Sequence, residues 1–118
     1  MELNTYQKAA HSTAVYYDKH REVMQSPTVL DILYCALGLA GEAGEVANKV
    51  KKIIRDDASC ITLNRVREIK EELGDCLWYI AEIANILNMD LSTVAASNLY
   101  KLKKRQDNGT LKGSGDNR

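Results

Sequence analysis

At 118 residues, the chain has the length of one domain with one hydrophobic core. Its 16 basic and 16 acidic residues give a formal net charge of zero, which argues against electrostatic binding to a nucleic acid polymer. The sequence contains no apolar run near the roughly 20 residues of a membrane span, so we expect neither a membrane segment nor a signal peptide.

The three cysteines bear on the cellular compartment. Cys35, Cys60 and Cys76 are odd in number and widely spaced. This pattern suits free thiols in a reducing environment better than a disulfide framework or a zinc site. We therefore expect a cytoplasmic protein.

Apolar residues recur at spacings of three and four, which predicts an all-α domain. Pro27 separates the first two expected helices, Thr62 is placed to cap the third, and Asp90 or Ser92 can cap the fourth. Short connections join the helices, which is typical of a four-helix bundle. The expected helices cover Asn4–Met24, Thr28–Arg55, Leu63–Leu87 and Ser92–Arg105.

The chain changes character after residue 105. Residues 106–118 carry almost no apolar side chains and cannot build a core of their own. We therefore expect a single all-α domain over residues 1–105, followed by a polar tail. The tail is either disordered or a lid that closes over a ligand and offers it Lys112 and Arg118.

Two pairs of acids lie in the expected second and third helices: Glu42 with Glu45, and Glu72 with Asp75. Residues three apart share one helix face, about 4.5 Å apart along the axis. If the two helices pack side by side, four carboxylates converge, and such repulsion is tolerable only around a cation. An all-oxygen ligand set without thiolate or imidazole selects Mg²⁺, with Mn²⁺ as a substitute.

The neighbours of the first acid pair favour an interior site over a solvated helix face. A lone pair of helical acids is usually solvated and often has basic partners four residues away. Here Val46 occupies that position for Glu42, and only Lys49 serves Glu45. Apolar residues surround both acids in the sequence, so we interpret them as part of an interior site.

Three glycines also mark this stretch. Gly38, Gly41 and Gly44 recur every three residues in the expected second helix. Each weakens a helix by roughly 0.8–1 kcal/mol relative to alanine. We therefore predict that another helix or a ligand approaches this face closely.

Further polar and aromatic residues are candidates for ligand contacts. Asn98, Lys101 and Arg105 share one face of the fourth expected helix, either as a solvated basic surface or as an edge that faces phosphate. Trp78 follows Asp75 by one helical turn and is most simply a core residue. If the site holds a nucleotide, Trp78 could also flank the base.

The residue types limit the chemistry. No serine or cysteine has a sequence context that supplies a base, and no Walker-type loop is present. A di-iron bundle needs glutamate three residues before histidine, but Lys8 precedes His11 and Tyr17 precedes His20. What remains is metal-assisted hydrolysis of a phosphoanhydride, with a carboxylate orienting the attacking water or accepting its proton.

The paired acids, together with their flanks, resemble a known family. Glu42-Ala43-Gly44-Glu45 and Glu72-Leu73-Gly74-Asp75 look like the ExxE…ExxD signature of MazG-like nucleotide pyrophosphohydrolases, which are all-α proteins. The resemblance extends over most of the chain from Tyr6 and is weakest from His20 to Asp31. It is carried further by the stretches Leu37–Lys52, Glu71–Tyr79, Asn98–Leu102 and Gly113–Arg118.

This resemblance implies Mg²⁺-dependent hydrolysis of a nucleoside triphosphate to the monophosphate and pyrophosphate, as in nucleotide-pool house-cleaning. It implies that the metal is held by Glu42, Glu45, Glu72 and Asp75, and that Asn98 and Lys101 lie at the nucleotide or phosphate end of the site. It also implies a homodimer or a tetramer, with pockets often placed between subunits.

Two other interpretations are open at this point. One is a catalytically silent helical module that binds a nucleotide or a protein partner, which would suit a chain that lacks one motif acid. This chain lacks none. The other is a regulatory helical dimer without a ligand, which leaves the paired acids unexplained.

Overall fold

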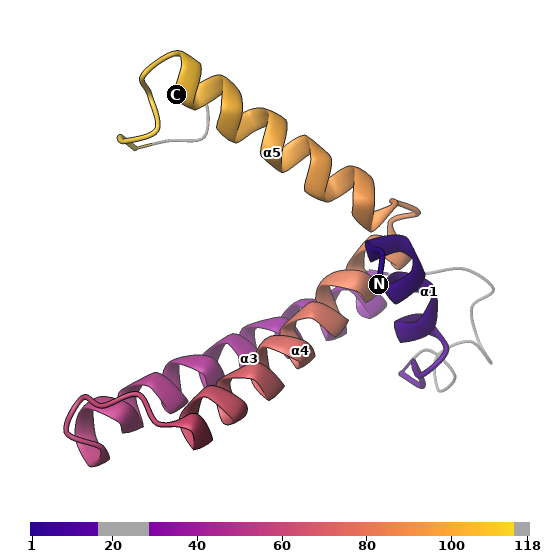
Figure 1. Ribbon diagram of the computed structural model, residues 1–118. Coiled ribbons are helices and arrows are strands. Elements are labelled where there is room, and N and C mark those ends of the chain that lie inside the picture. Colours follow the sequence, from indigo (N-terminus) through magenta and orange to yellow (C-terminus); the bar gives the residue numbers. More distant parts are fainter. Residues whose placement is uncertain (17–28, 115–118) are drawn as a thin grey trace.

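The computed structural model of the protein describes residues 1–16 and 29–114. Four α-helices and no β-strand are present in these two ranges, so the predicted all-α class is confirmed. None of these helices combines the length and the apolar content that a membrane-spanning segment needs. The helices are α1 (Leu3–His11), α3 (Val29–Asp56), α4 (Leu63–Ile86) and α5 (Leu91–Asp107), shown in Figure 1.

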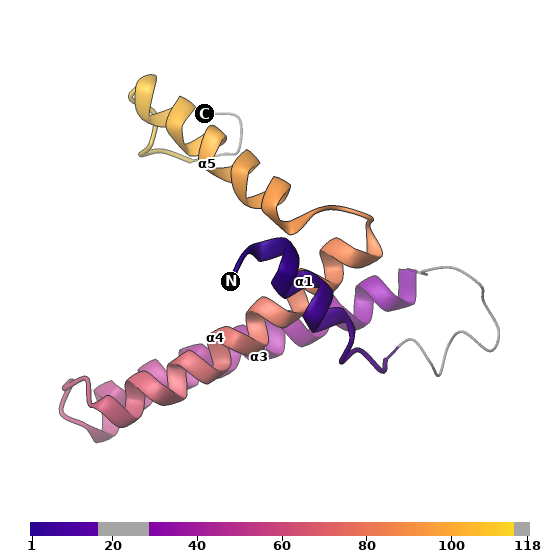
Figure 2. The same cartoon turned by 45° about the vertical axis from the view of Figure 1, so that its right-hand side comes forward.

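The two longest helices form an antiparallel hairpin. α3 and α4 run side by side in both views, joined by a short connector at one end (Figures 1 and 2). The Thr62 hydroxyl accepts the backbone N–H of Arg65 at 3.2 Å, which confirms the predicted cap of α4. The Arg65 side chain donates to Asp57 at 2.6 Å and to Glu68 at 2.8 Å, and so fastens the connector to α4.

The first helix is shorter than predicted, because α1 ends at His11. The next two residues turn back onto it: the Ser12 hydroxyl donates to the carbonyl of Ala9 at 2.6 Å, and the Thr13 hydroxyl donates to that of Ala10 at 2.7 Å. Such side chains compete for the carbonyls that a continuing helix would use. The rest of the predicted helix, residues 17–24, and the break at Pro27 lie outside the described residues.

The buried core lies where α1 crosses α4. Ala10, Ala81, Ala84 and Leu91 form one cluster, against which Tyr6 and Trp78 pack. A second cluster joins α3 to the segment after α1, with partly buried aromatic and isoleucine side chains around it, and consists of Ala14, Tyr16 and Cys35. The hairpin end nearer α1 is therefore the better-packed end.

α5 leaves the hairpin at an angle (Figures 1 and 2), and its first turn packs against α1. Within one chain the four helices therefore do not close into a single bundle. Large apolar side chains remain exposed on all three long helices. They include Leu33, Leu37, Ile54, Val66, Leu73 and Leu99.

Candidate metal centre

The two acidic pairs sit near the middle of the α3–α4 hairpin. Both helices are continuous through the motifs, so the spacing of three residues places each pair on one helix face. Oxygen atoms of Glu42, Glu72 and Asp75 lie within 4.8 Å of one another. Glu42 and Glu72 are half-buried and Asp75 is exposed, so the group opens towards solvent on one side. The hairpin brings together three of the four predicted ligands.

Glu45 is placed differently from the other three. It is exposed and, among the described residues, is not part of the converging group. Its charge still acts on Glu42, one turn earlier on α3, and contributes to raising the pKa of that carboxyl. Glu45 therefore stands at the edge of the centre.

The electrostatics of the group are those of crowded like charges. Partial burial raises the pKa of Glu42, and the neighbouring charges of Asp75, Glu72 and Glu45 raise it further. The pKa of the Cys76 thiol, on the same stretch of α4, is raised by burial and then by Glu42, Asp75 and Glu72. A thiol kept protonated is a poor metal ligand, so the donor set consists of carboxylate oxygens.

Among the residues that the structure describes, Lys49 is the basic residue that forms an ion pair with the converging acids. The Nζ atom of Lys49 lies 3.4 Å from a carboxylate oxygen of Glu72, and both side chains are largely shielded from solvent. From the sequence, Lys49 was the expected helical partner of Glu45. The structure pairs it across the hairpin instead, so Glu72 is the acid whose charge is best compensated without a cation.

Trp78 joins α4 to the segment after α1. Its indole N–H donates to the hydroxyl of Thr13 at 2.8 Å and to the carbonyl of Ala10 at 3.2 Å. The ring packs edge-on against Tyr79, at 5.0 Å between centroids, and against Tyr16, at 6.3 Å. The predicted core role is therefore observed, and the half-buried ring forms part of an aromatic group that begins one turn beyond Asp75.

Tyr79 and Tyr34 complete this aromatic group, which the sequence analysis did not identify. Burial raises the pKa of the Tyr79 hydroxyl, and the charge of nearby Glu42 adds to the effect. Tyr34 stacks on Tyr16 with 5.1 Å between centroids. The available signal was the helical spacing: Tyr79 follows Asp75 by four residues, on the same side of α4.

The three glycines of α3 have different surroundings. A Cβ atom at Gly38 would overlap the ring of Tyr79, which confirms the predicted close approach at this position. A Cβ atom at Gly41 or Gly44 would meet no atom of the described residues within 4 Å. For these two glycines the described part of this chain supplies no close neighbour, so the predicted approach of another helix or a ligand stays a prediction.

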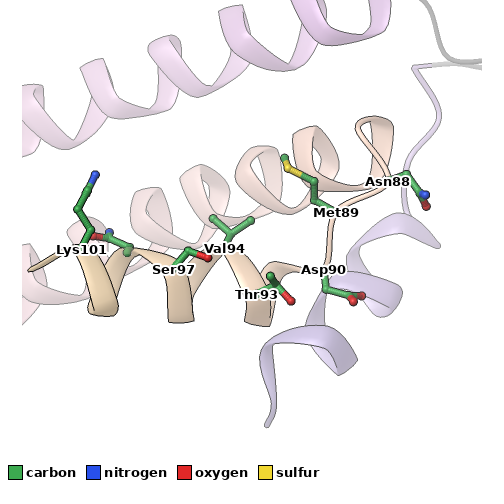
Figure 3. Close-up of a pocket in the computed structure, with 8 residues that line it drawn as sticks. Asn88, Met89, Asp90, Thr93, Val94, Ser97 and Lys101 are labelled. Carbon is green, nitrogen blue, oxygen red and sulfur yellow. The ribbon is translucent and has the colours of Figure 1, made fainter. Parts of the chain in front are cut away.

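The residues predicted to face phosphate are on α5, whereas the acids are on α3 and α4. Asn98 and Lys101 are exposed and line a groove of about 800 Å³, which follows the turn before α5 and the first turns of that helix (Figure 3). Arg105, predicted to share their exposed face, is buried. Lys112 is exposed in the tail, and Arg118 lies outside the described residues.

A fully buried carboxylate lies seven residues after Asp75 and was also missed. Glu82 has no exposed surface, accepts the hydroxyl of Tyr16 at 3.0 Å and contacts the Nδ1 atom of His11 at 3.2 Å. His11 thus pairs with an acid on α4, although it has no glutamate at the spacing that a di-iron site needs. The seven-residue spacing from Asp75, two helical turns, was the available signal.

Comparison with known proteins places the chain in a family. The model of the MazG nucleotide pyrophosphohydrolase domain matches residues 32–110, which include both acidic motifs and the whole of α5. A protein of Mycobacterium phage L5, named Gene 37 protein, is 46% identical over 118 residues and is covered over its full length, as is this chain. No solved structure gives a significant match. Because the family model matches most of the chain and the match contains both acidic pairs, the chain belongs to the MazG nucleotide pyrophosphohydrolase domain family.

Proposed function

We propose that the protein is a Mg²⁺-dependent nucleoside triphosphate pyrophosphohydrolase, which cleaves an NTP or dNTP to the monophosphate and pyrophosphate and serves nucleotide-pool house-cleaning. The observation that carries the proposal is the convergence of Glu42, Glu72 and Asp75 on the α3–α4 hairpin, inside the region that matches the family. Three crowded carboxylates without thiolate or imidazole suit Mg²⁺, or Mn²⁺ in its place.

The raised pKa of Glu42 is the electrostatic consequence of the same convergence, and it supports a fit between these residues and a dication. It reflects burial and the like charges of Asp75 and Glu72, which a bound cation would offset. These three acids would hold the metal, and we propose Glu45 at the edge as a fourth ligand. When bound, Mg²⁺ supplies charge neutralisation on the phosphates and lowers the pKa of a coordinated water.

The protein's own residues then have separable tasks. One carboxylate of the acidic group orients the attacking water or accepts its proton. Asn98 and Lys101 bind the phosphates, with Lys112 and Arg118 of the tail closing over them. Trp78 flanks the base from the aromatic group next to the acids. Arg105 is the weakest of the proposed substrate contacts because its side chain is buried.

We also propose that a second copy of the chain covers the open side of the molecule, in a homodimer or a tetramer. The open side is the one between α5 and the α3–α4 hairpin (Figure 1). The radius of gyration is 17.6 Å, whereas a compact domain of this length has about 13.5 Å. The accessible surface is 8753 Å², against about 6,400 Å² for a compact monomer of this mass. The excess is larger than the roughly 800 Å² that each partner buries in a standard interface.

Pyrophosphate release tests the activity directly. We would incubate the full-length protein with each ribonucleoside and deoxyribonucleoside triphosphate, with Mg²⁺ and with EDTA. We expect release that requires Mg²⁺, and the ranking of substrates would describe the base pocket. Nucleotide binding without any release would instead support the silent binding module.

Two adjacent acids provide a matched pair of variants. Glu72→Gln removes a proposed metal ligand, whereas Glu71→Gln makes the same change at an exposed position outside the converging group. We expect the first to abolish turnover and weaken Mg²⁺ binding, and the second to leave both close to wild type. Full activity of Glu72→Gln would remove this residue from the metal site.

A further inference from the structure

The start of α5 is held by side chains of α1. The backbone N–H of Leu91 donates to Oε1 of Gln7 at 2.8 Å, and that of Ser92 donates to Oδ1 of Asn4 at 2.9 Å. The first N–H groups of a helix have no partner inside that helix. Asp90 occupies the cap position, but its side chain makes no capping bond in the described structure. Residues more than eighty positions away therefore replace the local cap that the sequence predicts.

The other end of the Gln7 carboxamide is bound as well. Its Nε2 atom donates to the carbonyl of Met89 at 2.8 Å and to Oδ1 of Asn85 at 2.9 Å. Gln7 is only 6% exposed, so these bonds form away from bulk water, where an unpaired amide is costly. One side chain thus connects the end of α4, the turn after it and the first residue of α5.

The α4 side of this joint is fixed by further polar contacts. Nδ2 of Asn85 donates to the buried carboxylate of Glu82 at 2.8 Å. Glu82 in turn accepts the Tyr16 hydroxyl and contacts His11. Gln7 therefore docks on a part of α4 whose side chains are already held in place, and α5 is the element that the joint orients.

The direction of α5 determines where its polar residues lie. Leu91 is buried at the joint, whereas Asn98 and Lys101 are exposed further along the helix. Lys101 lies ten residues beyond Leu91, which is about 15 Å of helix. A tilt of about 10° at the joint would therefore move Lys101 by about 2.5 Å, enough to break a contact with a phosphate.

We propose that Gln7 is a positioning residue that fixes the direction of α5 and, through it, the positions of Asn98 and Lys101. The effect on nucleotide rests on the proposed function. The effect on helix direction does not, because it depends only on the hydrogen bonds that Gln7 makes.

Spin-label distances test the joint without any activity. The labels are placed on Cys60, an exposed cysteine at the far end of the hairpin, and on Lys104→Cys on α5, with Cys76→Ala as background. Labelled protein is diluted in unlabelled protein to suppress distances between copies. We expect one narrow distance distribution in this background, and a shifted or broader one when Gln7→Leu is added.

Kinetics then test the consequence for the site. We expect Gln7→Leu to raise KM for the best triphosphate roughly tenfold with kcat nearly unchanged, because a binding contact that is equally strong in the transition state is lost. Mn²⁺ binding without nucleotide should stay unchanged, because the acids lie on the hairpin. Gln106→Leu, the same change at an exposed position of α5, should leave KM and kcat unchanged.

Two further variants keep the test decisive. Gln7→Glu retains an acceptor for Leu91 and adds a favourable charge at the helix start, but it cannot donate to Met89, so its effects should be intermediate. If Gln7→Leu does not fold, Asn4→Ala removes one capping bond and should give a smaller shift in the same direction.

The possible outcomes separate the two proposals. Unchanged distances in a folded Gln7→Leu protein would overturn the positioning role. Changed distances with unchanged KM would overturn its consequence for the nucleotide. If the unaltered protein releases no pyrophosphate, the proposed function fails, while the distance measurement still decides whether Gln7 sets the direction of α5.

Discussion

At the scale of single residues, the acids of the centre differ in how their charges are compensated. Glu72 has Lys49 within 3.4 Å, whereas Glu42 faces three other acids and has a raised pKa. Without metal, Glu42 is therefore the acid whose ionisation opposes folding most clearly. Replacing it should have a different effect on stability from replacing Glu72.

We expect Glu42→Gln to abolish turnover and yet raise the Tm of the EDTA-treated protein by roughly 2 °C at pH 7. The sign follows from the raised pKa: the ionised form is disfavoured in the folded state, so the penalty exists only above the pH at which the carboxyl loses its proton. The difference in Tm between variant and wild type should therefore shrink as the pH falls towards about 4.

Thermal unfolding of both proteins across this pH range checks the prediction. Glu72→Gln is the comparison. Its Tm should rise less than that of Glu42→Gln, because the variant loses the ion pair with Lys49. A lower Tm for Glu42→Gln at pH 7 without metal would contradict repulsion as the cause of the raised pKa.

At the scale of one element, the glycines of α3 offer a second prediction. Gly38→Ala should destabilise the protein, because the new Cβ atom overlaps the ring of Tyr79 and that ring packs against Trp78. Gly41→Ala has open space within the chain and should gain up to about 0.8–1 kcal/mol of helix propensity. Urea unfolding of both variants measures whether the free energy of unfolding falls for Gly38→Ala and rises for Gly41→Ala. A stability loss in Gly41→Ala would indicate that a second copy covers this position.

The element scale also shows what the sequence could predict. Long apolar repeats predicted both ends of α4 and the C-terminal end of α3 to within one residue, and the spacing of acids on them predicted the convergence of Glu42, Glu72 and Asp75. The end of α1 was missed, because it depends on two hydroxyls that bond back to the helix.

Other features could not be predicted, because they depend on contacts between distant parts of the chain. The direction of α5 is set by Gln7 and Asn4, which the sequence separates from it by more than eighty residues. The pairing of Lys49 with Glu72 rather than with Glu45 likewise appears only when α3 and α4 are side by side. Local patterns predict the helices, whereas side chains from elsewhere decide how those helices are oriented.

At the scale of the whole molecule, the exposed apolar surface would lower the solubility of an isolated chain unless a partner covers it. Leu37 on α3 is 72% exposed and Leu99 on α5 is 68% exposed, and both helices border the open side of the molecule (Figure 1). A second copy placed there would bury this surface and bring the α5 of one chain near the hairpin of the other. Assembly and activity should then depend on the same residues.

We therefore expect Leu37→Glu to shift the protein from a dimer or a tetramer towards a monomer, because a charge at the centre of an apolar interface stays unpaired when buried. Light scattering coupled to size exclusion measures the mass. Leu63→Glu is the control, since Leu63 is exposed at the far end of the hairpin, beside the connector. A monomeric wild-type protein with full activity would contradict the second copy altogether. A monomeric, inactive Leu37→Glu protein that still binds Mn²⁺ would show that the acids suffice for the metal, whereas turnover needs the neighbouring chain.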